Sequence, residues 1–214
     1  YIVFIDSDDY IESNYLELLY NGIVENDADI CACGYKKHDY SFGDTYIRTD
    51  VPCCDSLEPI TVDKLSIWNL FYFKNSVHSY AITVVWNKIY KQKLFKTLRF
   101  EEGVIFEDEY FNYKVYDLCE KITLIPEPLY IYRRNRKSSI TNLNFNQTKK
   151  QYYPLLLRSL YLLKNKQYKE SIFLFKNFLN EYIYKFDSKE KQFNKTFRKF
   201  YRKAWFKVNI RYFF

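Results

Sequence analysis

Residues 1–9 of the chain read YIVFIDSDD, and no other stretch says as much about its fold. The first five residues are apolar, β-branched or aromatic, which is typical of a buried strand. Three carboxylates follow at the carboxyl end of this strand, where open α/β sheets bind their ligands. Crowded carboxylates repel one another unless a cation lies among them, and hard divalent cations prefer oxygen ligands. The stretch therefore predicts an α/β fold with a metal–phosphate site, and hence an enzyme.

Beyond this stretch, hydrophobic spacing predicts strands that alternate with helices, followed by an entirely helical C-terminal part. Up to residue 143 we expect helices over 13–24, 61–73 and 106–119, strands over 29–35, 121–125 and 129–133, an exposed hairpin over 39–50 and a helical turn over 91–96. Beyond residue 146 the pattern predicts only helices, over 147–165, 167–184 and 189–209. We therefore divide the chain into an α/β part, 1–143, and a helical extension, 144–214.

The 214 residues include no Met, and the chain opens in mid-strand, so we expect it to be the C-terminal part of a longer reading frame. Its net charge is +7, and residues 185–214 carry ten Lys and Arg against two acids, a local net of +8. Such a basic, aromatic segment favours an anionic membrane surface as partner. The alternative is a helix that packs on the catalytic domain with a basic solvent face. Only the positive charge would favour a nucleic acid as partner, and we do not expect one.

No run of about 20 apolar residues is present, so the sequence predicts no transmembrane helix. We expect a cytoplasmic protein, and the basic end leaves open a peripheral association with the inner face of the plasma membrane. The five cysteines are an odd number, and we expect reduced, buried thiols. A zinc site from Cys31, Cys33, Cys53 and Cys54 is conceivable, but these cysteines lack the paired two-residue gaps of zinc ribbons.

The acidic group after the first strand has three chemical interpretations and one structural one. A calcium loop would need alternating ligands and a Gly where Ile11 stands, so this interpretation fails. In a phosphatase of the haloacid-dehalogenase type, Asp6 would be the nucleophile and Asp8 the acid/base, but that motif prefers Thr or Val where Tyr10 stands. The third interpretation is an Asp-x-Asp metal site for a nucleotide-sugar. The structural one is a solvated turn that caps the next helix.

A second group of acids, Glu107-Asp108-Glu109, lies about one hundred residues later at the expected start of a helix. A carboxylate at the edge of a pocket can act as a general base toward a hydroxyl. Acids at a helix N-terminus also complement the helix dipole, which is the simpler explanation when the group is taken alone. Together with the first acidic group, the functional interpretation gains weight.

Two further stretches combine aromatic, amide and cationic groups. Trp86-Asn87-Lys88 offers a flat apolar face beside hydrogen-bonding groups, the mixture that a sugar needs. A core Trp followed by a surface Lys would give the same sequence pattern. Residues 130–140 read YIYRRNRKSSI, in which clustered cations could contact a diphosphate or form a solvated basic loop.

These motifs, in the order YIVFIDSDDY, WNKIY, FEDE and PLYIYRR with a following Ser-Ile, resemble the bacterial family 2 glycosyltransferases with the GT-A fold. The resemblance is strongest to the members that build capsule, lipopolysaccharide and exopolysaccharide, and it covers residues 1 to about 142. In such enzymes the N-terminal half of the nucleotide-binding domain precedes the acidic motif. The resemblance therefore implies that this chain holds the metal and acceptor half of a GT-A domain without its N-terminal half.

The resemblance also implies a role for each matching residue. Asp6 would lie near the nucleotide ribose or the water shell of the metal, Asp8 would bind Mn²⁺ or Mg²⁺ that bridges the diphosphate, and Asp9 would support it. The remaining roles are a general base with its neighbour, an acceptor site and a diphosphate contact: Asp108 and Glu107; Trp86, Asn87 and Lys88; Arg133 or Arg134.

The function implied is the inverting, metal-dependent transfer of a sugar in surface polysaccharide synthesis. The donor would be a nucleotide-sugar, in the first instance UDP-linked, and the acceptor a saccharide or a lipid-linked sugar. One base and no enzyme nucleophile suffice for inversion. Two alternatives stay open: the dehalogenase-type phosphatase, and a non-catalytic module that binds a membrane or polyanion.

Overall fold

The computed structural model describes residues 1–40, 45–64, 66–67, 79–104, 106–135, 153–165, 171 and 173–174. The chain divides into two compact units, one of Tyr1–Glu102 with Glu107–Asn142 and the other of Gly103–Phe106 with Leu143–Phe214. All the site residues predicted from the sequence belong to the first unit, so the fold of that unit positions the site.

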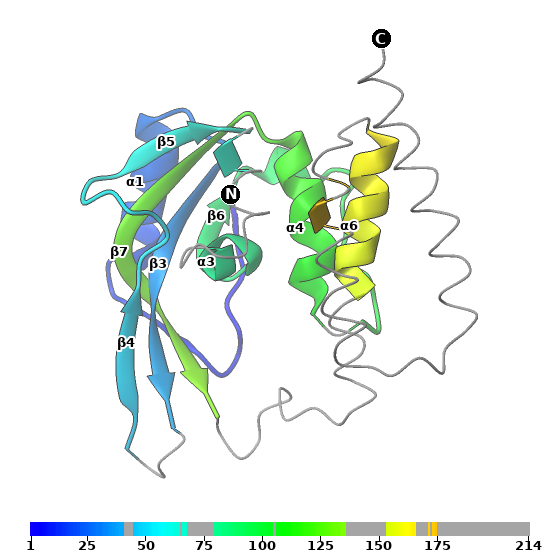
Figure 1. Cartoon of the computed structure of the whole chain (residues 1–214). Coiled ribbons are helices and arrows are strands. Elements are labelled where there is room, and N and C mark those ends of the chain that lie inside the picture. The colour runs from blue at the N-terminus through cyan, green and yellow to red at the C-terminus, as the bar shows by residue number, and fades with distance from the viewer. Residues whose placement is uncertain are drawn as a thin grey trace. The chain divides into compact units, whose positions relative to one another are not determined.

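The first unit is built on a mixed sheet in which seven strands are described (Figure 1). The strand order is β1-β6-β3-β7-β2, while β4 pairs with β3 and β5 pairs with β7. Only β3 and β7 run parallel to each other, and the other pairs are antiparallel. The strands are β1 Ile2–Val3, β2 Tyr10–Ile11, β3 Ile30–Asp39, β4 Ile47–Val51, β5 Ile60–Asp63, β6 Lys88–Tyr90 and β7 Lys121–Arg134. The predicted α/β class is confirmed.

The long pair β3 and β7 forms the centre of the sheet. The strand expected over 29–35 is β3, and the hairpin expected over 39–50 is the β3–β4 pair. The two strands expected over 121–125 and 129–133 are instead one strand, β7, because its two prolines fall where the β3–β7 register shifts. Proline is tolerated at such an irregularity, since no ladder hydrogen bond is required of it. On β3, Gly34 makes room there: a Cβ atom would lie 2.7 Å from the Val51 carbonyl oxygen.

The opening apolar run is less buried than its sequence predicts. Only Ile2–Val3 pair as a strand, and their described partner is β6 alone. Ile5 is 48% exposed, and Ile2 and Val3 are half-buried. A strand at the end of the described strand order has one neighbour to cover it, so a hydrophobic run there does not reach full burial.

Residues 60–63 correct a second expectation. They form strand β5 rather than the start of a helix over 61–73, and they pair with β7 from Ile60 opposite Leu124 to Asp63 opposite Lys121. β-Branched residues favour a strand that finds a partner. The hydroxyls of Thr61 and Thr123 lie 3.0 Å apart across this pair. Residues 64, 66 and 67 are helical as expected, and residues 68–73, where the helix was expected to continue, lie outside the described residues.

The helices predicted near the site are confirmed. They are α1, Tyr15–Glu25, and α4, Glu107–Leu118, and the expected turn is a 3₁₀ helix, η1, Gln92–Phe95. A short helix that the sequence did not predict, α3, Ser79–Thr83, precedes β6. Figure 1 shows α1 on one face of the sheet and α3 and α4 on the other. Their buried side chains form the core around β3, β6 and β7.

In the second unit the described helix is α6, Tyr153–Lys164, within the helix expected over 147–165. Ser159 and Ser171 exchange side-chain hydrogen bonds to each other's carbonyl oxygens, at 3.2 and 2.8 Å. The helices expected over 167–184 and 189–209, and the basic residues 185–214, fall outside the described residues apart from residues 171, 173 and 174.

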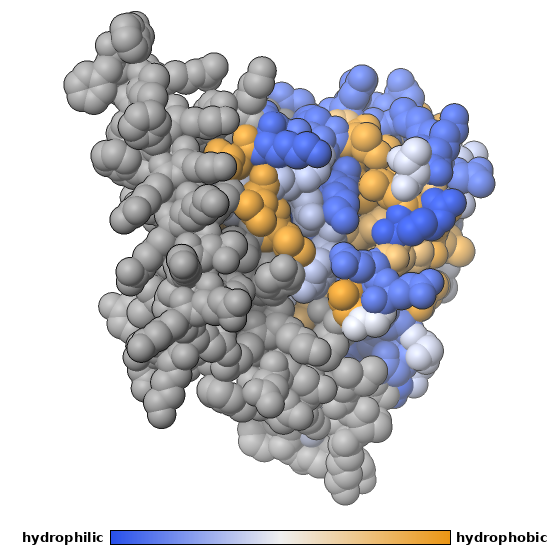
Figure 2. All heavy atoms as spheres, turned by 90° about the vertical axis from the view of Figure 1, so that its right-hand side faces the viewer, coloured by the Kyte–Doolittle hydropathy of each residue, from blue (hydrophilic) through white to orange (hydrophobic). Residues whose placement is uncertain are grey.

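The surface of the described residues mixes the two classes of side chain. On the face drawn in Figure 2, hydrophilic residues are interspersed with hydrophobic ones. Within the described ranges, no helix combines the length and the apolar character that crossing a membrane would take.

Candidate functional site

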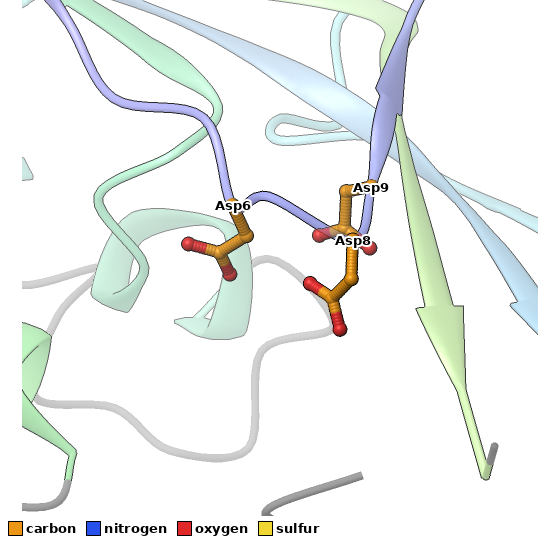
Figure 3. Close-up of side chains that lie close together, drawn as sticks. All are labelled: Asp6, Asp8 and Asp9. Carbon is orange, nitrogen blue, oxygen red and sulfur yellow. The ribbon is translucent and has the colours of Figure 1, made fainter. Parts of the chain in front are cut away.

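The loop between β1 and β2 gathers the three aspartates at one point. A turn closes the loop, in which the Asp9 N–H donates to the Asp6 carbonyl oxygen at 3.1 Å. One carboxylate oxygen from each of Asp6, Asp8 and Asp9 lies within 4.8 Å of the others, and Figure 3 shows the three side chains side by side. This donor set fits a hard divalent cation such as Mg²⁺ or Mn²⁺, which takes carboxylate oxygens. The grouping predicted for these aspartates is confirmed.

Asp9 is held by both of its carboxylate oxygens. The Tyr130 hydroxyl donates to Asp9 Oδ2 at 2.9 Å, and the Arg133 backbone N–H donates to Asp9 Oδ1 at 2.9 Å. Burial raises the pKa of Asp9 to about 6, and these two hydrogen bonds oppose that rise because they favour the charged form. Asp9 therefore anchors the loop to β7, and Asp6 and Asp8 are the more open members of the group.

The two arginines at the end of β7 differ in their position. The Arg133 guanidinium lies 4.7 Å from the centre of the Tyr10 ring, and its Nε–H donates to the Asp8 carbonyl oxygen. Arg133 is thus brought to the acidic loop, as a contact to its backbone. Arg134 is exposed, and its backbone carbonyl oxygen accepts from the Tyr40 N–H at 3.2 Å. For both, a diphosphate contact stays a prediction.

The second acidic group opens α4, as predicted, and lies close to the first. Glu107 is exposed and Asp108 is half-buried. Burial, with the charges of Glu107 and Asp6 as further causes, raises the pKa of Asp108 to about 7. Desolvation likewise raises the pKa of Asp6, with the Glu107 charge as second cause. Carboxylates one hundred residues apart in sequence therefore share one electrostatic environment, and Asp108 has the pKa that a general base needs near neutral pH.

Trp86, Asn87 and Lys88 are buried side chains, at 3%, 0% and 0% exposure. Trp86 stacks on Tyr130, with ring centroids 4.2 Å apart and planes at 22°, and on Tyr132 at 5.3 Å and 23°. Asn87 Nδ2 donates to the carbonyl oxygen of Cys33 at 2.6 Å. A direct contact with an acceptor stays a prediction, and the burial of all three favours a supporting role.

Lys88 ties α3 to the strand that follows it. Its Nζ donates to the carbonyl oxygens of Ala81 and Val84 and to Asn87 Oδ1, which occupy the three protons of an ammonium group. Burial lowers the pKa of Lys88 to about 7, and the negative charge of Asp108 is among the effects that raise it. Lys88 therefore lies within electrostatic reach of the predicted base.

Sequence reasoning missed the tyrosines that surround these residues. Tyr130 bonds the acidic loop, and Tyr15 donates from its hydroxyl to the Trp86 carbonyl oxygen at 2.7 Å. Tyr80 is 43% exposed, and burial of its hydroxyl raises the pKa of that hydroxyl, with the charge of Asp108 among the further causes. A signal was present, since Tyr130 and Tyr132 alternate along a strand and so share one face.

The cysteines are free and buried, as the sequence predicts. Burial raises the pKa of Cys31 and Cys33, and no cysteine belongs to a group of possible metal ligands within the part of the chain that the structure describes. The conceivable zinc site from Cys31, Cys33, Cys53 and Cys54 finds no support there.

Comparison with known proteins points to one enzyme class. Glycosyltransferase GlyA of Streptococcus pneumoniae is 40% identical over 141 residues, which are 66% of this chain and 20% of GlyA. Glycosyltransferase GlyG of the same organism is 32% identical over 149 residues, 68% of this chain and 47% of GlyG. The uncharacterized glycosyltransferase EpsJ of Bacillus subtilis is 32% identical over 142 residues, 64% of this chain and 39% of EpsJ. No protein-family model matches the chain.

A solved structure extends the comparison to the fold. TarS 1-349 of S. aureus matches with a TM-score of 0.54 and 18% sequence identity, over 85% of this chain and 47% of that one. At this identity the likeness concerns the fold alone, and it supports the predicted similarity to a GT-A domain. The chain spans less than half the length of each of the three curated relatives named above. It is thus a homologue of glycosyltransferases over about two thirds of its own length, with a sheet similar to that of TarS.

Proposed function

We propose that this chain is the metal- and acceptor-binding part of a glycosyltransferase of family 2. It would transfer a sugar from a nucleotide-sugar, in the first instance UDP-linked, to a saccharide or lipid-linked acceptor in the synthesis of a surface polysaccharide. The proposal rests mainly on one observation: Asp6, Asp8 and Asp9 converge within 4.8 Å beside the Glu107–Asp108 pair. The curated glycosyltransferase relatives favour it over the phosphatase and the non-catalytic module.

In this proposal Asp6 and Asp8 hold Mn²⁺ or Mg²⁺, and Asp9 fixes the loop through its hydrogen bonds to β7. When bound, such a cation neutralises negative charge on the diphosphate of the departing nucleotide. Asp6 suits this role because its side chain is exposed, whereas both carboxylate oxygens of Asp9 accept hydrogen bonds from β7. Arg133, whose guanidinium lies over Tyr10 and bonds the Asp8 carbonyl oxygen, would place a positive charge beside the bound diphosphate.

Asp108 is the proposed general base, with Glu107 beside it. It would accept the proton of the acceptor hydroxyl while the hydroxyl oxygen attacks the anomeric carbon from the face opposite the nucleotide. The configuration at that carbon inverts in this single displacement, and no enzyme nucleophile is used. The pKa of about 7 suits the step because such a carboxylate is about half ionised at neutral pH and is basic enough to take a proton.

The acceptor side of the site would be lined by tyrosines with the Trp86-Asn87-Lys88 stretch behind them. Tyr80 is 43% exposed, lies near Asp108 and faces Tyr132 at a ring distance of 6.2 Å. An aromatic ring of this kind offers a surface for the C–H face of a sugar. Trp86, Asn87 and Lys88 would then fix the position of this surface rather than contact the acceptor.

Thermal unfolding with Mn²⁺ and a panel of nucleoside diphosphates tests the proposal. We expect a metal-dependent rise in Tm with one diphosphate. At a hundredfold excess over Kd, binding adds about 2.7 kcal/mol to the free energy of unfolding. That corresponds to a rise of roughly 5–11 °C for a chain of this size. Asp8→Asn should abolish the rise, and Asp50→Asn, on β4, should retain it. A folded chain that shows no shift, or one that survives in Asp8→Asn, would contradict the proposed site.

A further inference from the structure

The hydroxyl of Tyr130 bridges the two ends of the acidic loop. It accepts a hydrogen bond from the Asp6 backbone N–H at 3.1 Å and donates one to Asp9 Oδ2 at 2.9 Å. A hydroxyl has one proton to donate and two lone pairs to accept with, so it can satisfy both partners at once. One side chain of β7 thus reaches both ends of the Asp6–Asp9 loop, 121 and 124 residues away in sequence.

The ring that carries this hydroxyl is fixed on every side for which contacts are described. Tyr130 is 0% exposed, its ring stacks on Trp86 at 4.2 Å, and it meets the Tyr15 ring edge-on at 6.2 Å. Its backbone pairs with Ile11 of β2, two residues beyond Asp9. A rigid ring transmits a fixed position to its hydroxyl, and buried rings pack at near-crystalline density. The core of the sheet therefore fixes the position of the loop.

We propose that Tyr130 is the positioning residue of the acidic loop: its hydroxyl holds the loop in the conformation that brings Asp6 and Asp8 together. The part concerning a bound cation rests on the proposed function, whereas the part concerning the conformation of the loop does not. Arg133 shares the task, since its N–H and guanidinium bond Asp9 and the Asp8 carbonyl oxygen. The described hydrogen bonds of Arg133 reach Asp8 and Asp9 and not the Asp6 end of the loop, so Arg133 does not replace the bridge.

Hydrogen exchange of the full chain tests the ordering of the loop without any metal. In Tyr130→Phe the ring and its stacking remain, while both hydrogen bonds of the hydroxyl are lost. We expect peptides over residues 4–10 to exchange at least tenfold faster than in the wild type. The matched control is Tyr15→Phe, which removes an equally buried hydroxyl that donates to the Trp86 carbonyl oxygen instead. Equal exchange over residues 4–10 in Tyr130→Phe and Tyr15→Phe would overturn the proposal.

A second readout is the affinity of the same three proteins for Mn²⁺, measured by calorimetric titration. Residues that hydrogen-bond to metal ligands typically change the metal affinity by about 10- to 100-fold when they are removed. We expect a loss of that size in Tyr130→Phe and none in Tyr15→Phe. Wild-type protein that binds no Mn²⁺ would count against the proposed function alone. Wild-type and Tyr130→Phe proteins that bind Mn²⁺ equally would count against Tyr130. If Tyr130→Phe does not fold, rapid exchange of the Asp6 amide in the wild type would overturn the proposal.

Discussion

Asp108 illustrates how one residue acquires its chemistry from its surroundings. Its carboxyl is half-buried at the start of α4, and the charges of Glu107 and Asp6 lie near enough to raise its pKa to about 7 together with burial. The positive end of a helix stabilises a carboxylate, so the helix dipole opposes the rise in pKa that burial and the neighbouring acids cause. Lys88 adds the opposing positive charge from the core.

Asp108→Asn should abolish sugar transfer in the full-length protein, with a loss of about 10²–10⁴-fold for a base. The amide cannot accept the proton, but it preserves the shape of the carboxyl, so nucleotide binding should survive. In the wild type, kcat/KM should rise with pH through about 7, because the base must be ionised. The measurement is a pH profile of transfer together with nucleotide titration. Glu127→Gln serves as a control on β7, and parallel loss of binding and transfer in Asp108→Asn would contradict the role.

At the same scale, the sequence predicted the acids of the site but not their supports. An apolar run that ends in three aspartates, and a second acidic group before a helical pattern, suffice to identify Asp6, Asp8, Asp9 and Asp108 as candidates. Tyr130 could not be found in this way because its role depends on the parallel pairing of β3 with β7 and on the return of β2, which no local pattern contains. The burial of Lys88 depends on tertiary contacts in the same manner.

At the scale of elements, one buried ammonium group joins helix α3 to strand β6. α3 has five residues, which is too short for stability on its own, so its ending depends on outside partners. Nζ of Lys88 supplies them by bonding the carbonyl oxygens of Ala81 and Val84. The hydroxyl of Tyr116 and the amide of Asn112 on α4 donate to the carbonyl oxygens of Ile82 and Thr83. The four carbonyls of residues 81–84 at the end of α3 thus each accept a hydrogen bond from a side chain.

Lys88→Met should destabilise the protein by about 3 kcal/mol, because three buried acceptors lose their donor. In Lys91→Met, whose lysine pairs with Asp27 at the surface, the loss should stay below about 1 kcal/mol. The folded-state pKa of Lys88, about 7, lies below its unfolded value of 10.5, so the stability of the wild type relative to Lys88→Met should rise between pH 7 and pH 10. Urea unfolding at both pH values measures these effects. Equal stabilities of the two variants would contradict the role of Lys88.

Much of the element order could be predicted from periodicity, and the errors have physical causes. Helix α1 was predicted because its apolar residues recur at helical spacing, and α4 from the acids that open it. Residues 61–63 were expected in a helix and instead belong to β5, since pairing with β7 outweighs a short local pattern. Pro126 and Pro128 were taken for a break between strands, but Gly34 opposite them lets one strand continue through the irregularity.

At the scale of the whole molecule, the positive charge is concentrated in residues 185–214. Residues 185–214 hold a local net charge of +8, so the remainder of the chain is close to neutral at −1. A polybasic segment with interleaved aromatics attracts anionic lipid by about 1 kcal/mol per cation near the surface. An acceptor carried on a lipid would be found at such a surface, which connects this segment to the proposed function.

Neutralising five cations of this segment should weaken binding to vesicles that contain anionic lipid by at least tenfold, because each contributes to the attraction. The changes are to Gln at Lys195, Arg198, Lys199, Arg202 and Lys203. Co-sedimentation measures binding, which should fall with salt in the wild type and be absent with neutral lipid. Five Gln substitutions at Lys36, Lys37, Lys91, Lys93 and Lys96 give a control of equal charge. Wild-type behaviour of the first variant would rule out this membrane contact.

The burial of every cysteine has a practical consequence for following the protein in solution. All five thiols are at most 4% exposed, so an alkylating reagent reaches them only when the fold opens. Cys31 and Cys33 lie on β3, Cys119 follows α4, and Cys53 and Cys54 lie between β4 and β5. Mass spectrometry of labelled peptides would therefore give the order in which these regions open, residue by residue, without any introduced dye.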